Sequence, residues 1–160
     1  MYSRMKELNP KWVEVVKLFA NASPYFKNQN MKVVDLKYGE SLVEVELDRK
    51  HLQGYGYIHG GVYSALIDSA GFFAVYTQVD GENSAATIEM KINYLSSVKS
   101  GKLLAHAHCI TLGKNIGLAG ETINNEGNKL LAHGSVTVMV KPPLKTLTVA
   151  NLPTKFNEPN

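Results

Sequence analysis

The chain has 160 residues, of which 44% are hydrophobic and 19% are charged, and its formal net charge is +3. This length suits one domain with its own core, and the single cysteine excludes an intrachain disulfide and a cysteine-based zinc site. The apolar part contains no run near the roughly 20 residues that a membrane helix needs, and charges near the start argue against a secretory signal. We therefore expect a cytoplasmic protein without a membrane partner, and without a nucleic-acid partner because no basic stripe is interleaved with aromatic residues.

The first quarter of the chain predicts one helix and two strands. Asn9 and Pro10 precede an apolar stripe, which predicts a short amphipathic helix that ends between residues 21 and 24. Segments 31–37 and 41–47 follow, and their pattern predicts two half-buried strands joined by a turn.

A glycine-rich loop over residues 54–61 leads into the most apolar segment of the chain. Residues 62–79 are apolar on nearly every side, and their length favours a buried helix over a strand. At 100° per residue, the large apolar side chains gather on one side of this helix, while small residues and Asp68 gather on the other. We expect the side with large residues to pack against a sheet, and the side with small residues to be approached closely by another group.

The second half of the chain predicts four strands. Residues 86–94 alternate between apolar and polar, which predicts a long strand with one wet face. Three more strands are predicted at 101–112, 116–124 and 129–140, the last two joined by a hairpin turn.

Hairpin succession implies an antiparallel sheet that covers the central helix, so the predicted fold class is α+β. The expected organisation is a helical extension over 1–30, a core domain over 31–141 and a loose, proline-punctuated tail over 142–160.

Asp68 and the segment that precedes its helix are the strongest candidates for chemistry. Asp68 is the only charged residue between positions 59 and 80, and burying a carboxylate is costly unless it is paired. His59, Gly60 and Gly61 lie where the first amides of the helix have no intrahelical partner, so an oxyanion could reach those amides. A structural contact of Asp68 and a tight turn at the glycines explain these features equally well.

Positive charge collects in one stretch of the sequence. Between residues 90 and 120 there are four lysines and no acidic residue; they are Lys91, Lys99, Lys102 and Lys114. This stretch would attract an anionic ligand, or would simply form the solvated rim of a sheet.

Residues 53–68, QGYGYIHGGVYSALID, resemble the signature of hot-dog-fold acyl-CoA thioesterases of the phenylacetic-acid-degradation type. The acid follows the histidine by nine positions, as in that family, and ATIEMKINYL over 86–95 resembles its next strand. The resemblance covers residues 30–141. It implies a hot-dog fold, in which a curved antiparallel sheet wraps around one central helix.

The resemblance also implies roles for individual residues. Asp68 would be the nucleophile or general base, the Gly60 amide would be the oxyanion donor, and Gly61 beside it would bind the substrate. His59 would help near the thioester, and Thr87 would position water or substrate. In such enzymes the carboxylate and the oxyanion hole come from different subunits, which implies a homodimer or a homotetramer.

Two further expectations concern the substrate and one departure from the family. Lys114 and Lys99 would meet the phosphates of coenzyme A in an acyl-CoA substrate. Relatives carry Asn six residues before the histidine, whereas this chain has Gln53, and an amide displaced by about one ångström can cost about a hundredfold in rate. Thioester cleavage needs no metal or other cofactor, because the thiolate is a good leaving group.

Two rival functions remain open from the sequence. One is a hydratase or dehydratase of acyl thioesters with the same fold, and the other is a non-catalytic acyl-CoA-binding protein. His106 and His108 share one strand face and could imitate a metal pair, but no third ligand of suitable spacing is evident. Cys109 falls on the opposite face and is interpreted as a small buried hydrophobe.

Overall fold

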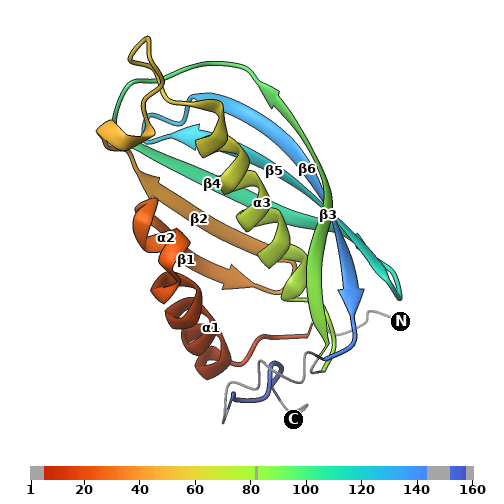
Figure 1. The fold of residues 1–160 in the computed structure, drawn as a ribbon. Helices are drawn as coiled ribbons and strands as arrows, with labels where there is room; N and C mark the ends of the chain where they lie inside the picture. Colours follow the sequence, from red (N-terminus) through yellow and green to blue (C-terminus); the bar gives the residue numbers. More distant parts are fainter. Residues whose placement is uncertain (1–5, 82, 144–151, 158–160) are drawn as a thin grey trace.

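The computed structural model describes residues 6–81, 83–143 and 152–157. Six strands form one sheet in the order β1-β2-β4-β5-β6-β3, and every neighbouring pair is antiparallel. Their bounds are β1 (Met31–Lys37), β2 (Glu40–Glu46), β3 (Ser84–Tyr94), β4 (Lys102–Leu112), β5 (Ile116–Asn125) and β6 (Leu130–Lys141). The sheet curves around the helix α3 (Gly60–Tyr76), so the expected α+β architecture is confirmed (Figure 1).

The N-terminal segment forms two helices where one was predicted. The side chain of Asn9 caps α1 (Pro10–Ala22), which buries Trp12 against the rest of the molecule. A second short helix, α2 (Pro24–Asn28), follows because Ser23 supplies a new cap and a proline stands at its first position. The predicted end of the first helix is confirmed, and α2 was not anticipated.

Helix α3 lies in the concave side of the sheet. Its large side forms the centre of the core, where Leu66, Ile67, Ala70 and Ala74 are each 0% exposed. The helix begins two residues earlier than predicted because His59 caps it, and a 3-10 turn (Arg49–His51) comes before the loop that leads into it. Within the described residues, no helix is long and apolar enough to cross a bilayer.

The strand β3 is the edge of the sheet next to β6, and this position changes its exposure. The alternating pattern over 86–94 predicted one wet face, whereas in the structure all of β3 is partly or fully exposed. The reason is that β3 has a neighbour on one side only, and α3 does not extend over its whole inner face (Figure 1). The other strand predictions agree with the structure to within two residues.

The described part of the C-terminal tail is packed, which differs from the expectation of a loose extension. Residues 152–157 return to the end of α3, and Lys155 is only 7% exposed. The Asn9 amide donates to the Lys155 carbonyl at 2.8 Å, and Phe156 packs on Tyr38. Residues 144–151 and 158–160 lie outside the described part of the chain.

Candidate active site at helix α3

The first amides of α3 differ in their partners. The Gly61 amide donates to Nδ1 of His59 at 2.8 Å, so the imidazole acts as the helix cap. The Gly60 amide makes no hydrogen bond to any of the described residues. It therefore remains available to an external acceptor, at the end of the helix where the macrodipole is positive.

Tyr94, the last residue of β3, lies against this helix start. A Cβ added to Gly60 would stand 3.3 Å from the Tyr94 ring, and the Tyr94 hydroxyl is 3.1 Å from Oγ of Ser64. Tyr63 meets the same ring edge to face, with centroids 5.9 Å apart. Gly60, Tyr63 and Tyr94 line one surface cavity of about 370 Å³ together with Leu95. A small acyl or thioester group could enter next to the free amide.

Asp68 lies near the middle of α3, one helical turn before Gly71, and it is not among the fully buried residues of the helix. The residue is half-buried, and its Oδ1 is fully buried without a hydrogen-bond partner among the described residues. Eight residues separate it from Gly60, which corresponds to about 12 Å along the helix axis. Within one chain, the carboxylate and the free amide are therefore too far apart to act on one carbonyl.

Among the described residues, neither the Gln53 side chain nor the Thr87 side chain is hydrogen-bonded to Asp68 or Gly60. Oε1 of Gln53 accepts the amide of Tyr55, so the side chain folds back onto its own loop. Thr87 pairs with Val138 near the start of β3. Tyr94 and the neighbouring Gly60 lie at the other end of this strand.

The two lysines expected at the substrate phosphates lie at opposite ends of the sheet. Lys99 follows β3 at the end where α3 begins, and its ammonium stands 4.7 Å from the Tyr57 ring centroid. Lys114 is exposed in the turn between β4 and β5, close to the end of α3. One chain alone cannot bring both to one phosphate group.

Glu121 is a buried acidic residue that the sequence reasoning did not single out. It lies on β5 with 2% exposure, and neither of its carboxyl oxygens has a hydrogen-bond partner among the described residues. Burial, together with the charge of Asp68, raises the pKa of Glu121 to about 8. The sequence pattern could have predicted this burial, because Glu121 lies on the same face of β5 as Ala119 and Ile123. Both of these residues are 0% exposed.

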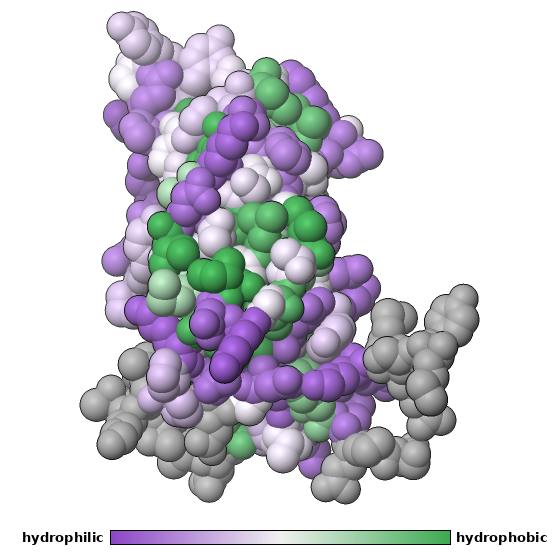
Figure 2. All heavy atoms as spheres, turned by 90° about the vertical axis from the view of Figure 1, so that its right-hand side faces the viewer, coloured by the Kyte–Doolittle hydropathy of each residue, from purple (hydrophilic) through white to green (hydrophobic). Residues whose placement is uncertain are grey.

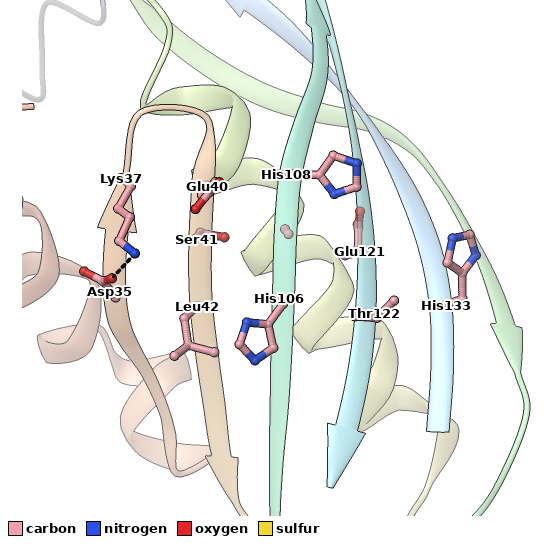
Figure 3. A pocket seen from close by; sticks show the side chains of 11 residues that line it. Asp35, Lys37, Glu40, Ser41, Leu42, His106, His108, Glu121, Thr122 and His133 are labelled. Carbon is pink, nitrogen blue, oxygen red and sulfur yellow. Dashed lines mark ion pairs between the residues drawn. The ribbon is translucent and has the colours of Figure 1, made fainter. Parts of the chain in front are cut away.

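The outer face of the sheet carries a histidine-lined hollow of about 370 Å³. His106, His108 and His133 project from β4 and β6 on the side of the sheet away from α3 (Figure 3). Over the described ranges, no group of three or more His, Cys, Asp or Glu residues is arranged to hold a metal ion. Cys109 is half-buried, and burial raises the pKa of its thiol.

Comparison with known proteins places this chain in a family. The family described as "Thioesterase superfamily" matches residues 55–132. A 1,4-dihydroxy-2-naphthoyl-CoA hydrolase from Listeria monocytogenes is 29% identical over 115 residues, which cover 72% of this chain and 94% of that relative. A Haemophilus influenzae protein with the name "Putative esterase" is 32% identical over 105 residues, which cover 64% of this chain and 76% of that relative.

The fold agrees with the sequence relationship. The solved structure of a thioesterase from Haemophilus influenzae matches with a TM-score of 0.76 at 24% identity, covering 84% of this chain and 94% of that chain, and it supports the fold alone. The motif over 53–68 lies largely within the matched region, and the free Gly60 amide stands at the start of its helix. This chain belongs to the thioesterase superfamily and is a thioester hydrolase with the hot-dog fold.

Proposed function

We propose that this enzyme hydrolyses an acyl-CoA thioester to a carboxylic acid and free coenzyme A, in a site shared by two copies of the chain. The free amide of Gly60 carries this proposal, because thioester cleavage needs a donor for the oxyanion that develops on the carbonyl. The Listeria relative that acts on a CoA thioester supports the choice of coenzyme A. A cytoplasmic location is part of the proposal, in keeping with a single free cysteine.

Asp68 is the residue that attacks the carbonyl or activates water. It is the only acidic residue on α3, and because the residue is only half-buried, a carboxylate oxygen can reach a substrate. His59 holds the Gly61 amide, which leaves Gly60 as the free donor. Thr87 and Gln53 then orient water or substrate from a neighbouring copy or loop.

A second copy of the chain would bring the carboxylate of one copy close to the free amide of the other. If a two-fold axis passes beside α3 midway between Gly60 and Asp68, the helices of two copies run antiparallel. Asp68 of one copy then approaches Gly60 of the other, and the separation of about 12 Å within one chain is no longer an obstacle. The same operation brings Lys99 of one copy toward the end of the sheet that holds Lys114 of the other, where coenzyme A phosphates could meet both.

The edge strand β3 is suited to this association. Its 11 residues leave a row of backbone groups unpaired, which proteins normally protect. Ile88 and Met90 on this strand are 50% and 44% exposed. Figure 2, which faces the β3 side of Figure 1, shows hydrophobic residues gathered in the middle of this surface. Antiparallel pairing of β3 with its copy would bury them, in a dimer or in a tetramer of two dimers.

The direct test measures thiol release from aryl-CoA and straight-chain acyl-CoA substrates by the wild type and by Asp68→Asn. We expect turnover by the wild type and a loss of about 10²–10⁴-fold in the variant, because a base or nucleophile has been removed. Equal turnover by both proteins would overturn the role of Asp68. Loss of water from a 3-hydroxyacyl-CoA without thiol release would favour the hydratase, and binding without turnover would favour the non-catalytic protein.

A mixing experiment tests whether the site is shared. Asp68→Asn and Gly60→Pro are each expected to be nearly inactive, since the second change removes the amide donor. A dimer with one subunit of each kind keeps one intact site, so a statistical mixture should recover about a quarter of wild-type activity. If both groups act from the same chain, mixing recovers nothing.

A further inference from the structure

Glu121 occupies a place in the core where a carboxyl group is unusual. It points from β5 toward α3, and its cross-strand neighbours are the small residues Ala107 and Gly134. Its Oε1 lies 2.7 Å from the point where a Cβ on Gly71 would stand. The absence of a side chain at Gly71 therefore leaves the space that this carboxyl occupies.

The unpaired polar atoms of the core belong to two residues. Among the described residues, the buried side-chain oxygens without a hydrogen-bond partner are Oδ1 of Asp68 and both oxygens of Glu121. Asp68 stands one helical turn before Gly71, and residues three apart on a helix are neighbours with Cβ atoms about 5–6 Å apart. Asp68 therefore lies on the turn of α3 next to the space that the Glu121 carboxyl occupies, close enough for its charge to raise the pKa of Glu121.

Among the described residues, one charged group faces Glu121 from the helix α3. Asp68 faces it from α3, while Ser41 on β2 is already engaged with the carbonyl of Ala70 at 2.6 Å. The inner neighbours on β4 and β6 carry no charge. On the other side of the sheet, the hollow that includes Glu121 is lined by titratable residues, which are Asp35, Lys37, Glu40, His106, His108 and His133.

We propose that Glu121 is a positioning residue for Asp68: as a neutral acid it donates its O–H to Oδ1 of Asp68, directly or through one water. This hydrogen bond satisfies the buried oxygen of Asp68 and fixes the rotation of its carboxylate. The other Asp68 oxygen is then directed away from the core, toward the thioester. The inference rests on the proposed function, since it concerns the geometry of the group that acts on the substrate.

The proton on Glu121 makes this arrangement dependent on pH. Because its pKa is about 8, Glu121 is protonated at pH 7 and becomes a carboxylate in mildly alkaline solution. Two adjacent carboxylates repel each other, and the donor is lost. Activity of the wild type should therefore fall as pH rises through about 8.

The test compares Glu121→Gln with Glu121→Leu across the pH range. The glutamine amide keeps a donor that does not titrate, so we expect kcat to stay within a few fold of wild type and the alkaline decline to disappear. Leucine removes the donor, and kcat should fall by between about tenfold and a hundredfold while KM stays nearly constant. Thermal melting confirms that both variants are folded.

Two results would overturn the inference. One is a folded Glu121→Leu enzyme with wild-type kcat, and the other is a Glu121→Gln enzyme that keeps the alkaline decline. Either result would mean that Glu121 only fills space in the core.

An infrared measurement separates this inference from the proposed function. At pH 7 the wild type should show the C=O band of one protonated carboxylic acid, which is lost in Glu121→Gln and shifted in Asp68→Asn because its acceptor has changed. No such band, or a band unaffected by Asp68→Asn, would overturn the hydrogen bond even in an active thioesterase. A missing turnover of all thioesters would instead overturn the function, while the band would still report the carboxyl pair.

Discussion

The backbone groups at the two ends of α3 differ in whether they have hydrogen-bond partners. At the C-terminal end, Nζ of Lys155 donates to the carbonyls of Tyr76 and Val79 at 3.0 and 2.6 Å, and the ammonium lies 4.1 Å from the Tyr76 ring centroid. At the N-terminal end, the Gly60 amide has no partner among the described residues. Both ends of a helix carry unsatisfied backbone groups, and here the fold satisfies one set and leaves a donor free at the other. In the proposed function, this difference separates an end of the helix that contributes to stability from an end that binds the substrate.

After the loss of activity expected for Asp68→Asn, the largest expected effect comes from removing the free donor. Gly60→Pro deletes the amide hydrogen, yet proline suits the first helical position, and the extended conformation of His59 is compatible with a following proline. We expect kcat for thioester hydrolysis to fall by about 10²–10³-fold, measured by thiol release. Gly60→Ala is the matched control, because it adds a similar Cβ beside Tyr94 but keeps the amide. If both variants lose activity equally, the crowding of Tyr94 is responsible and the amide is not.

The next effect concerns Glu121 beneath the middle of α3. Its pKa is raised from 4.5 to about 8 in the folded protein, so its contribution to stability is complete below 4.5 and is lost as pH rises to about 8. Between pH 5 and 7.5 the free energy of unfolding should therefore fall by about 3 kcal/mol more in the wild type than in Glu121→Gln. Urea denaturation at several pH values measures the difference. Parallel pH profiles for the two proteins would contradict it.

A smaller effect is expected at the C-terminal end of α3. Burial lowers the pKa of Lys155 to about 8, so it remains charged at pH 7. Lys155→Met leaves the two carbonyls without their donor, and the free energy of unfolding should fall by about 1–3 kcal/mol. The value of kcat should change less than about twofold, because the described hydrogen bonds of the Lys155 ammonium are with carbonyls at the C-terminal end of α3 and include neither Asp68 nor Gly60. A loss of activity without a loss of stability would place a function at this end as well.

The smallest effect is expected for the cap of α3. His59→Ala removes the acceptor for the Gly61 amide and should cost about 1 kcal/mol in the free energy of unfolding. His59→Asn supplies another good cap and should recover most of that loss. Melting temperatures of the three proteins report the cap, and thiol release reports any further role near the thioester. A drop in activity in His59→Asn at unchanged stability would establish that second role.

Much of the fold could be predicted from the chain alone, and so could two candidate residues of the proposed site. Alternation at a period of two and an all-round apolar segment specify strands and a buried helix through local geometry, so the strand bounds and α3 agree closely with the structure. Asp68 and Gly60 stood out because a charge in an apolar helix and glycines at a helix start are visible as departures from pattern. The second short helix was missed because it depends on a single cap at Ser23.

Other features depended on contacts between distant segments. The burial of Lys155 and the packing of residues 152–157 bring together parts of the chain about 75 positions apart, which no local pattern records. The exposure of β3 follows from its place at the sheet edge, and the position of the Glu121 carboxyl follows from the register that sets β5 under Gly71. The sequence by itself determined most of the secondary structure and the fold class, since these arise from local periodicity and composition, and it singled out Asp68 as the candidate acid. Only the tertiary structure decided which helix amide stays free and which carboxyl lies beside Asp68, because both depend on how separate elements pack.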